Sequence, residues 1–307
     1  MSPSTKKTPT VYAIVVTYNN RDEIIPCLHS LAMNSTECAL HVCVIDNASQ
    51  DGTQEQIQNY LQSPKPDLVL EPILNTKNVG FTKAVNQGLA LARNSHAEYI
   101  LFLNPDIVLP GDALLSLVPL FEARSVDVIA PQLAYEDGSV QPSCRRFPHH
   151  RDVLFNVAGL AALFPESAFW NGWKMGDFDH KSSREVDQPQ GAFLLARAQV
   201  AFEIGKWDEA FPMFFSDVDW CLRVKQVGYR TWFAAETQVL HHQGRSVHAA
   251  RPQMILSSHR SFIRYFYRHF RGWQWIAPNA LTAVMLVFSG AARYIAAQIF
   301  SMMRKLK

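Results

Sequence analysis

The sequence predicts an α/β protein built on a mostly parallel sheet flanked by helices. Short apolar runs alternate with helix-forming segments from residue 11 to residue 131. The runs are apolar at successive positions, which is typical of strands buried on both faces of a parallel sheet. Right-handed crossovers between such strands build a doubly wound layer, which binds ligands at the carboxyl ends of its strands.

The alternating elements follow one another along the first part of the chain. Predicted strands cover residues 11–17, 41–46, 68–73, 99–103 and 126–131, and predicted helices cover residues 23–33, 53–61, 81–92 and 111–123. Residues 135–190 contain many Pro, Trp and His residues, and we expect loops and short strands that shape a pocket there. A strand at 191–197 and helices at 198–204 and 216–227 complete the pattern.

The composition disfavours several classes of protein. The formal net charge is only +2 over 307 residues, so the chain lacks the basic field of a nucleic-acid-binding protein and we expect no nucleic-acid partner. The five cysteines are scattered without C-x-x-C spacing, which predicts free thiols in a reducing compartment. Residues 1–10 are polar and lack the apolar stretch of a secretory signal, so we expect a flexible, cytoplasmic N-terminus.

The C-terminal region, residues 251–307, differs from the preceding domain in composition. Residues 272–292 contain no charged side chain, and arginines and lysines lie on both sides. This pattern predicts helices associated with the inner face of the cell membrane, as a peripheral or monotopic segment. Pro278 and Asn279 weaken the case for a spanning helix. The alternative is an amphipathic helix that packs on residues 11–250 or on a second subunit.

Polar side chains lie at the ends of the first two predicted strands. Thr17 and Asn19 end the first strand, and Asp46 ends the second. Adjacent strand ends form a cleft, in which Asp46 can accept a hydrogen bond from a base N–H or a ribose hydroxyl. The alternative is a strand-to-helix turn in which the polar residues, above all those at 51–53, only cap the next helix.

The loop before the predicted helix at 81–92 could face an anion. Its backbone N–H groups lie at a helix start, and Gly80 permits close approach of a ligand. The chain has no G-x-G-x-x-G after its first strand and no G-x-x-x-x-G-K-[ST]. Their absence argues against a dinucleotide dehydrogenase and a P-loop enzyme.

Later in the chain, acids and a histidine are candidates for chemistry. Asp106 follows a strand, where a carboxylate can bind Mg²⁺ or Mn²⁺ or cap a helix. Asp217 and Asp219 are two residues apart, so at most one points into a cleft, and the other is a cap or a partner of Arg223. His242 could contact a metal or a phosphate, or be structural.

Taken in order, these segments resemble family 2 glycosyltransferases of the GT-A fold, particularly the bacterial rhamnosyltransferase-like group. The resemblance covers residues 11–246 and depends on the ordered set, because each motif alone is weak. The matching segments are VVTYN at 15–19, VIDNASQDGT at 44–53, NVGFTKAVNQG at 78–88, LNPD at 103–106, QGAFLLAR at 190–197, the block at 208–223 and HQGRS at 242–246. The resemblance implies a GT-A, Rossmann-like domain over residues 11–250.

The resemblance also implies roles for the candidate residues in binding the donor. Thr17, Asn19 and Asp46 would hold the nucleoside, and Asn78 and Lys83 would lie near the nucleotide.

For metal binding and catalysis, the resemblance implies that Asp106 binds Mg²⁺ or Mn²⁺ with His242 as a second contact, and that Asp217 is the general base. Two positions depart from the family pattern. Asn104 stands where the familiar D-x-D motif has its first acid, which puts metal dependence in doubt, and Ser216 stands where relatives often carry Glu, which leaves Asp219 as an alternative base.

The activity implied by the resemblance is inverting transfer of a sugar from a nucleotide diphosphate to an acceptor hydroxyl. The favoured donor is dTDP-L-rhamnose, used in bacterial surface polysaccharide assembly on a glycan or a polyprenyl-diphosphate-linked acceptor at the cytoplasmic membrane face. The alternatives are transfer from another nucleotide sugar such as a UDP-hexose, a non-catalytic nucleotide-sugar-binding protein, and a nucleotidyltransferase. No triphosphate-binding loop rich in Gly and Arg or Lys follows the first strand, which argues against the last.

Overall fold

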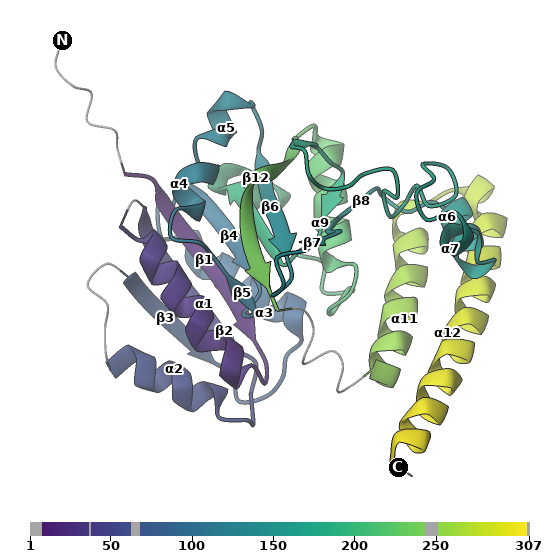
Figure 1. Ribbon diagram of the computed structural model, residues 1–307, viewed down its shortest axis with the longest axis horizontal. Helices are drawn as coiled ribbons and strands as arrows, with labels where there is room; N and C mark the ends of the chain where they lie inside the picture. Colours follow the sequence, from purple (N-terminus) through teal and green to yellow (C-terminus); the bar gives the residue numbers. More distant parts are fainter. Residues whose placement is uncertain (1–7, 37, 63–67, 243–250, 306–307) are drawn as a thin grey trace.

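The computed structural model describes residues 8–36, 38–62, 68–242 and 251–305. Its core is a sheet with the strand order β3-β2-β1-β4-β11-β6-β12-β5, with β7 paired to β6 and β9 paired to β12 (Figure 1). The strands are β1 Thr10–Thr17, β2 Ala39–Asp46, β3 Leu68–Leu74, β4 Tyr99–Leu103, β5 Ile107–Val108, β6 Val128–Ala134, β7 Val140–Gln141, β9 Arg184–Glu185, β11 Phe193–Arg197 and β12 Thr231–His241. A separate antiparallel pair joins β8 Cys144–Arg145 to β10 Gln188–Pro189.

The predicted mostly parallel sheet is confirmed. Strands β3, β2, β1 and β4 are parallel neighbours, and β6 is parallel to β12. Strand β11 lies between β4 and β6 and is antiparallel to both. The carboxyl ends of β1, β2 and β4 therefore meet at one edge of the sheet.

Helices cover both faces of the sheet. Residues 11, 13 and 15 of β1 pack in one apolar cluster, and residues 12, 14 and 16 pack in another. This period of two follows from the alternation of side chains along a strand. The first cluster includes side chains from α1 Arg21–Asn34, α2 Thr53–Gln62, α4 Ala113–Leu117 and α5 Leu120–Ala123. The second includes side chains from α3 Phe81–Ala92, α8 Ala198–Ile204 and α9 Ser216–Val227.

Gly88 brings α3 close to β1. A Cβ atom at this position would lie 2.6 Å from Cγ2 of Ile14. The close approach fixes the N-terminus of α3, which follows Gly80, beside the carboxyl ends of the first strands. The sequence therefore places a helix start at the predicted binding edge.

The structure corrects the sequence prediction in three places. The helix expected at 111–123 is two short helices, with Pro119 at the N-cap of the second. Strand β12 was not predicted, because its register with β6 shifts between Ala234 and Gln238 and polar residues interrupt the apolar pattern. The segment at 135–190 contains two helices, α6 His150–Val157 and α7 Leu160–Leu163, besides the expected loops and short strands.

The five cysteines are free, as predicted, and all of them are buried. Of the N-terminus predicted to be flexible, residues 1–7 lie outside the described residues, and Thr10 already belongs to β1.

The C-terminal region is helical over most of its described length. Helix α11 Arg251–His269 and helix α12 Ile276–Lys305 are joined through a 3₁₀ turn at Trp273–Trp275 and stand beside the sheet domain (Figure 1). Pro278 lies in the first turn of α12, where the missing N–H breaks no intrahelical bond. An apolar cluster joins both helices to α6, to α9 and to the loop before α9.

Candidate functional site

Hydrogen bonds join the loops that follow β1 and β2 at the predicted cleft. The N–H of Asn19 donates to Ser49 Oγ at 2.8 Å, and Asn19 Oδ1 accepts from the N–H of Gln50 at 2.9 Å. Asn19 has a φ of +54°, a left-handed conformation that Asn tolerates better than most residues. Thr17 is buried at the end of β1, and its hydroxyl oxygen lies 3.3 Å from Oδ1 of Asn20. Asn19 thus holds the two loops together.

Asp46 is fully buried, and within the described residues only one of its two carboxylate oxygens accepts hydrogen bonds. Its Oδ1 accepts from the N–H of Ser49 at 3.0 Å and from Nε2 of Gln54 at 2.6 Å. Its Oδ2 is buried and accepts no hydrogen bond within the described part of the chain. Leaving a buried acceptor unpaired costs roughly 1–3 kcal/mol, so this oxygen is suited to a donor on a bound ligand.

The loop before α3 is anchored to the end of β2 by a residue that sequence reasoning missed. Asn47 Oδ1 accepts from the N–H of Val79 at 2.9 Å, and its position next to Asp46 was the available signal. Asn78 is exposed, and its Oδ1 accepts from the N–H of Gly80 at 2.9 Å. Lys83 is exposed on the first turn of α3, 3.8 Å from Oε2 of Glu209. The loop therefore places Asn78 and Lys83 at the start of α3.

The unpredicted strand β12 brings a histidine to Asp106. Strand β5, directly after Asp106, pairs with the end of β12 so that His241 lies opposite Ile107. The N–H of His242 donates to the carbonyl of Asp106 at 3.0 Å. Nε2 of the buried His241 side chain lies 3.5 Å from Oδ1 of Asp106.

Gln141 fixes the tautomer of His241. Its Nε2 donates to the backbone carbonyl of His241 at 2.9 Å, so its Oε1 must be the atom that lies 2.8 Å from Nδ1 of the ring. Nδ1 therefore carries a proton, and in the neutral form of the ring the lone pair of Nε2 lies toward Asp106. The side chain of His242 points elsewhere, because its Nδ1 lies 2.7 Å from Oε1 of Glu136.

This pair suits a cation that is shared with a substrate. No group of three or more His, Cys, Asp or Glu side chains within the described residues could hold a metal. A carboxylate oxygen and an imidazole nitrogen form a two-ligand set, and Mg²⁺ or Mn²⁺ sites of that size are completed by water and substrate phosphates. Residues 243–246 of the predicted motif lie outside the described residues.

Asp217 lies at the start of α9 against a glycine. Its Oδ2 accepts from the N–H of Gly191 at 3.0 Å and from Nε2 of Gln188 at 3.3 Å. A Cβ atom on residue 191 would lie 2.8 Å from Cβ of Asp217, so only glycine allows this approach. Burial raises the pKa of Asp217, although hydrogen bonds from Gly191 and Val218 oppose the shift. A carboxylate with a raised pKa is a better proton acceptor than an ordinary Asp.

Asp219 has the structural role that the spacing required of one of the two acids. It is fully buried, with Oδ2 2.9 Å from Nε of Arg223 and Oδ1 2.9 Å from Nε2 of His269. Burial alone would raise the pKa of Asp219, but the hydrogen bond from His269 and the charge of Arg223 outweigh it and lower the pKa. The predicted partnership with Arg223 is confirmed, and both oxygens of Asp219 are engaged.

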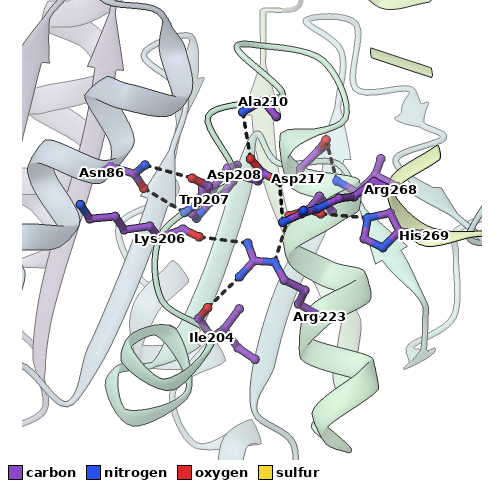
Figure 2. A network of polar contacts seen from close by, with 12 residues as sticks. Asn86, Ile204, Lys206, Trp207, Asp208, Ala210, Asp217, Arg223, Arg268 and His269 are labelled. Atoms are coloured by element: carbon purple, nitrogen blue, oxygen red, sulfur yellow. Dashed lines mark hydrogen bonds and ion pairs between the residues drawn. The ribbon is translucent and has the colours of Figure 1, made fainter. Parts of the chain in front are cut away.

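Helix α11 also holds the loop before α9. Figure 2 shows Asp208 and Ala210 on this loop near Arg268 of α11, and the guanidinium of Arg268 lies 3.2 Å from Asp208 Oδ2. Phe215, two residues before Asp217, has a φ of +68°, which is strained for a bulky side chain. Its ring packs 4.6 Å from that of Phe262 of α11, centroid to centroid. Contacts with α11 thus compensate for the strained backbone.

Comparison with known proteins decides the family. Residues 12–169, about half of the chain, match the family described as glycosyl transferase family 2. The chain belongs to this family. It is therefore a glycosyltransferase, and the predicted enzyme class is confirmed.

Two curated relatives are similar to this glycosyltransferase over most of their length. An N-acetylglucosaminyl-diphospho-decaprenol L-rhamnosyltransferase of Mycobacterium tuberculosis is 29% identical over 86% of each chain. The rhamnosyltransferase WbbL of Escherichia coli is 25% identical over 77% of this chain and 86% of its own. The predicted likeness to rhamnosyltransferases is confirmed.

The solved structure of a mannosyltransferase from Pyrobaculum calidifontis, in complex with GDP-Man and Mn²⁺, shares the fold. Its TM-score is 0.57 at 19% identity, over 98% of this chain and 81% of the mannosyltransferase. The GT-A fold predicted for this glycosyltransferase is confirmed.

The pairing of Asp219 with Arg223 and His269 leads to a prediction about stability. Asp219→Asn should lower the free energy of unfolding by about 3 kcal/mol at pH 7, because it leaves Arg223 and His269 without their carboxylate. The folded-state pKa of Asp219 is depressed, so its ionic stabilisation is complete above the ordinary value of 3.8 and is lost as the pH falls through the folded-state pKa. Urea denaturation over a pH series should show the two proteins converging below about pH 4.

Asp177→Asn is the matched control, because Asp177 pairs with Arg146 at the surface. Its cost should stay under about 1 kcal/mol. Equal losses in the two variants, or a loss for Asp219→Asn that does not change with pH, would contradict the prediction.

Proposed function

We propose that this glycosyltransferase moves L-rhamnose from dTDP-L-rhamnose to a hydroxyl of a lipid-linked acceptor during assembly of a bacterial surface polysaccharide. The observation that carries the proposal is the Mycobacterium tuberculosis relative, which aligns over 86% of both chains. The name of that relative specifies an acceptor sugar linked through a diphosphate to a polyprenol. The second relative is also a rhamnosyltransferase.

The donor would bind at the carboxyl ends of β1 and β2. The unsatisfied Oδ2 of Asp46 would accept from the imide N–H of thymine or uracil. Thr17 and Asn19 would line the nucleoside, and Asn78 and Lys83 would lie near the nucleotide at the start of α3, where the helix dipole favours an anion. The same arrangement suits a UDP-hexose, so a donor panel must separate the two.

Asp217 would act as general base in an inverting transfer. Its carboxylate would take the proton of the acceptor hydroxyl as that oxygen bonds to the anomeric carbon. The bond from this carbon to the diphosphate breaks in the same step, and the nucleotide diphosphate leaves. Asp219 is unsuited to this role because its pairing with His269 and Arg223 lowers its pKa, whereas burial raises the pKa of Asp217, whose oxygens accept only from neutral N–H groups.

The proposed base can be tested by substitution. Asp217→Asn should keep donor affinity, measured by calorimetry, and lower transfer by at least ~10²-fold, the lower limit expected for loss of a general base. The matched variant Asp219→Asn should lose less transfer activity while it loses stability. Because the base must be deprotonated and its pKa is raised, wild-type kcat/KM should fall as the pH drops, with an inflection above 3.8.

The transfer assay should use dTDP-L-rhamnose and UDP-hexoses, with release of nucleotide diphosphate read with and without acceptor. An inactive Asp219→Asn beside a nearly normal Asp217→Asn would reverse the assignment of the base. Turnover with UDP-hexoses alone would reject rhamnose as the sugar. Donor binding without turnover would indicate a non-catalytic protein.

A divalent cation would complete the site, as the fold neighbour with GDP-Man and Mn²⁺ suggests. Asp106 would hold it as predicted, and the orientation of the rings supports His241 rather than His242 as the second protein ligand. The cation would stabilise negative charge on the departing diphosphate. Gln141 would keep the lone pair of His241 Nε2 available by holding the proton on Nδ1.

Mn²⁺ binding distinguishes the two histidines. His241→Asn and Asp106→Asn should each weaken Mn²⁺ binding by at least about tenfold in the presence of dTDP, measured by electron paramagnetic resonance. His242→Asn is the matched control and should bind Mn²⁺ nearly as well as the wild type. Weak binding by His242→Asn together with normal binding by His241→Asn would restore His242 as the ligand.

Helix α12 would bring the enzyme to the inner face of the cell membrane. The segment Trp273–Ile299 is long and apolar enough to cross a membrane, with a mean hydropathy of 1.6. Large apolar side chains recur at helical spacing on one exposed face, and this face comprises Ile276, Leu281, Val284, Val287, Phe288, Ile295 and Ile299. The opposite face contains the buried Asn279, Thr282 and Leu286.

The packing of α12 favours a helix that lies in the membrane interface. Helix α11 lies beside α12 and carries exposed arginines at 260, 264 and 268. A spanning α12 would take these charges toward the hydrocarbon, at a cost of several kcal/mol for each. A helix in the interface instead buries its apolar face and leaves the arginines near lipid phosphates.

Vesicle flotation tests the membrane proposal. The wild-type protein should float with vesicles of phosphatidylcholine and phosphatidylglycerol, and Phe288→Glu should shift it to the soluble fraction, because the charge falls on the exposed apolar face. Leu163→Glu is the matched control, since Leu163 is a 69% exposed leucine on α7. A wild-type protein that stays soluble, or that forms a dimer which Phe288→Glu dissociates, would show that α12 faces a protein instead.

A further inference from the structure

A groove of about 400 Å³ lies between the sheet domain and α11. One wall is Pro212, on the loop that precedes α9, and the other is a face of α11 that includes Leu256, Arg260 and Arg264. We call it the α11 groove. Most of its lining surface is apolar, and its charged groups are the two arginines.

Within the part of the chain that the structure describes, the two arginines of the groove are not paired with acids. Arg264 donates to the carbonyl of Ala210, and among the described residues neither guanidinium forms an ion pair with a carboxylate. The next arginine along this side of α11, Arg268, is in contrast paired with Asp208. Leu256, Arg260 and Arg264 follow at intervals of four residues, so they lie on one side of the helix. The groove therefore offers two positive charges next to apolar surface, a combination that suits a phosphate ester of a lipid.

The wall at Pro212 connects the groove to the proposed catalytic site. The carbonyl of Pro212 accepts from the N–H of Thr82, in the first turn of α3, at 3.3 Å. A Cβ atom on Gly80 would lie 3.7 Å from the same carbonyl oxygen. Five residues after Pro212 the same loop reaches Asp217. One side of the groove is thus built from the segment that carries the proposed base and contacts the helix start at the donor site.

The other wall belongs to α11, which also packs against the buried face of α12. Helices α11 and α12 pack along each other, with Phe262 and Leu286 in one apolar cluster. Along α11, Leu256 is followed by Arg260 and Arg264 and then by Arg268, which pairs with Asp208 on the loop before Asp217. The order of these groups matches an amphiphile with an apolar chain, an anionic linker and a reacting sugar.

We propose that the α11 groove binds the lipid-linked acceptor, with Arg260 and Arg264 contacting its diphosphate and Leu256 and Pro212 contacting the first carbons of its chain. The inference deepens the proposed function and depends on its acceptor being linked to a polyprenyl diphosphate. The donor diphosphate would bind at a different place, near Asp106 and the start of α3.

Binding of undecaprenyl diphosphate in detergent micelles tests the groove without any transfer reaction. The wild-type protein should bind undecaprenyl diphosphate at least tenfold more tightly than undecaprenol, because charge-assisted hydrogen bonds to phosphate contribute about 1.5–3 kcal/mol, or tenfold and more. Arg260→Gln should remove most of this difference. Arg271→Gln, a matched loss of an exposed arginine just beyond α11, should leave it unchanged.

Kinetics with an N-acetylglucosaminyl-diphospho-undecaprenol acceptor supply the second readout. Arg260→Gln should raise the KM for this acceptor at least tenfold, with kcat, the KM for the donor and donor hydrolysis unchanged. Equal effects of Arg260→Gln and Arg271→Gln, or a preference for phosphate that phosphatidylglycerol abolishes at equal concentration, would overturn the groove as a specific site. An unchanged KM for the acceptor in Arg260→Gln would also overturn the groove as a specific site.

The two readouts separate this inference from the proposed function. If the wild-type protein prefers undecaprenyl diphosphate but transfers no sugar to the acceptor, the groove stands and the proposed reaction fails. If the protein transfers sugar to the acceptor but binds undecaprenyl diphosphate and undecaprenol equally, the reaction stands and the groove fails.

Discussion

The buried carboxylate of Asp219 is the constraint on which the arrangement of the site depends. An ionised side chain without solvent must be paired, and its two partners come from two elements, Arg223 of α9 and His269 of α11. Arg223 also donates to the carbonyls of Ile204 and Lys206, so the same charge fixes the end of α8 (Figure 2). The C-terminal helices are thereby attached to the catalytic domain through a group that cannot be exposed or neutralised cheaply. Asp217, two residues earlier on the same helix, faces Gly191.

A second constraint is the closure of the sheet edge by β12 and β5. Their antiparallel pairing is only two residue pairs long, yet it places Asp106 beside His241 although the two residues are far apart in the sequence. Gln141, from a third strand, then determines which ring nitrogen of His241 carries its proton. The pair of metal-binding candidates is therefore a product of strand pairing and cannot be recognised as a motif.

The sequence predicted the elements that depend on local pattern and missed those that depend on contacts between distant residues. Elements with a clear local period, such as α3, β4, α8 and α9, have the bounds that the sequence predicted. Strand β12 was missed because a register shift interrupts its pattern, and this hid the proximity of His241 to Asp106. The spacing of Asp217 and Asp219 predicted that only one acid could face a cleft. Choosing between them needed the position of His269, which is fifty residues away and has no local signal.

The aromatic contacts of α11 have a consequence for the reach of the enzyme. Phe215 packs on Phe262, and Phe262 belongs to the cluster that also contains Leu286 of α12. The loop before Asp217 thus packs through α11 against the buried face of α12. An α12 that rests in lipid then holds Asp217 at a constant height above the bilayer. In the proposed membrane-bound state, the site would act on the sugar that lies at this height, and the residue added by one transfer would lie beyond its reach.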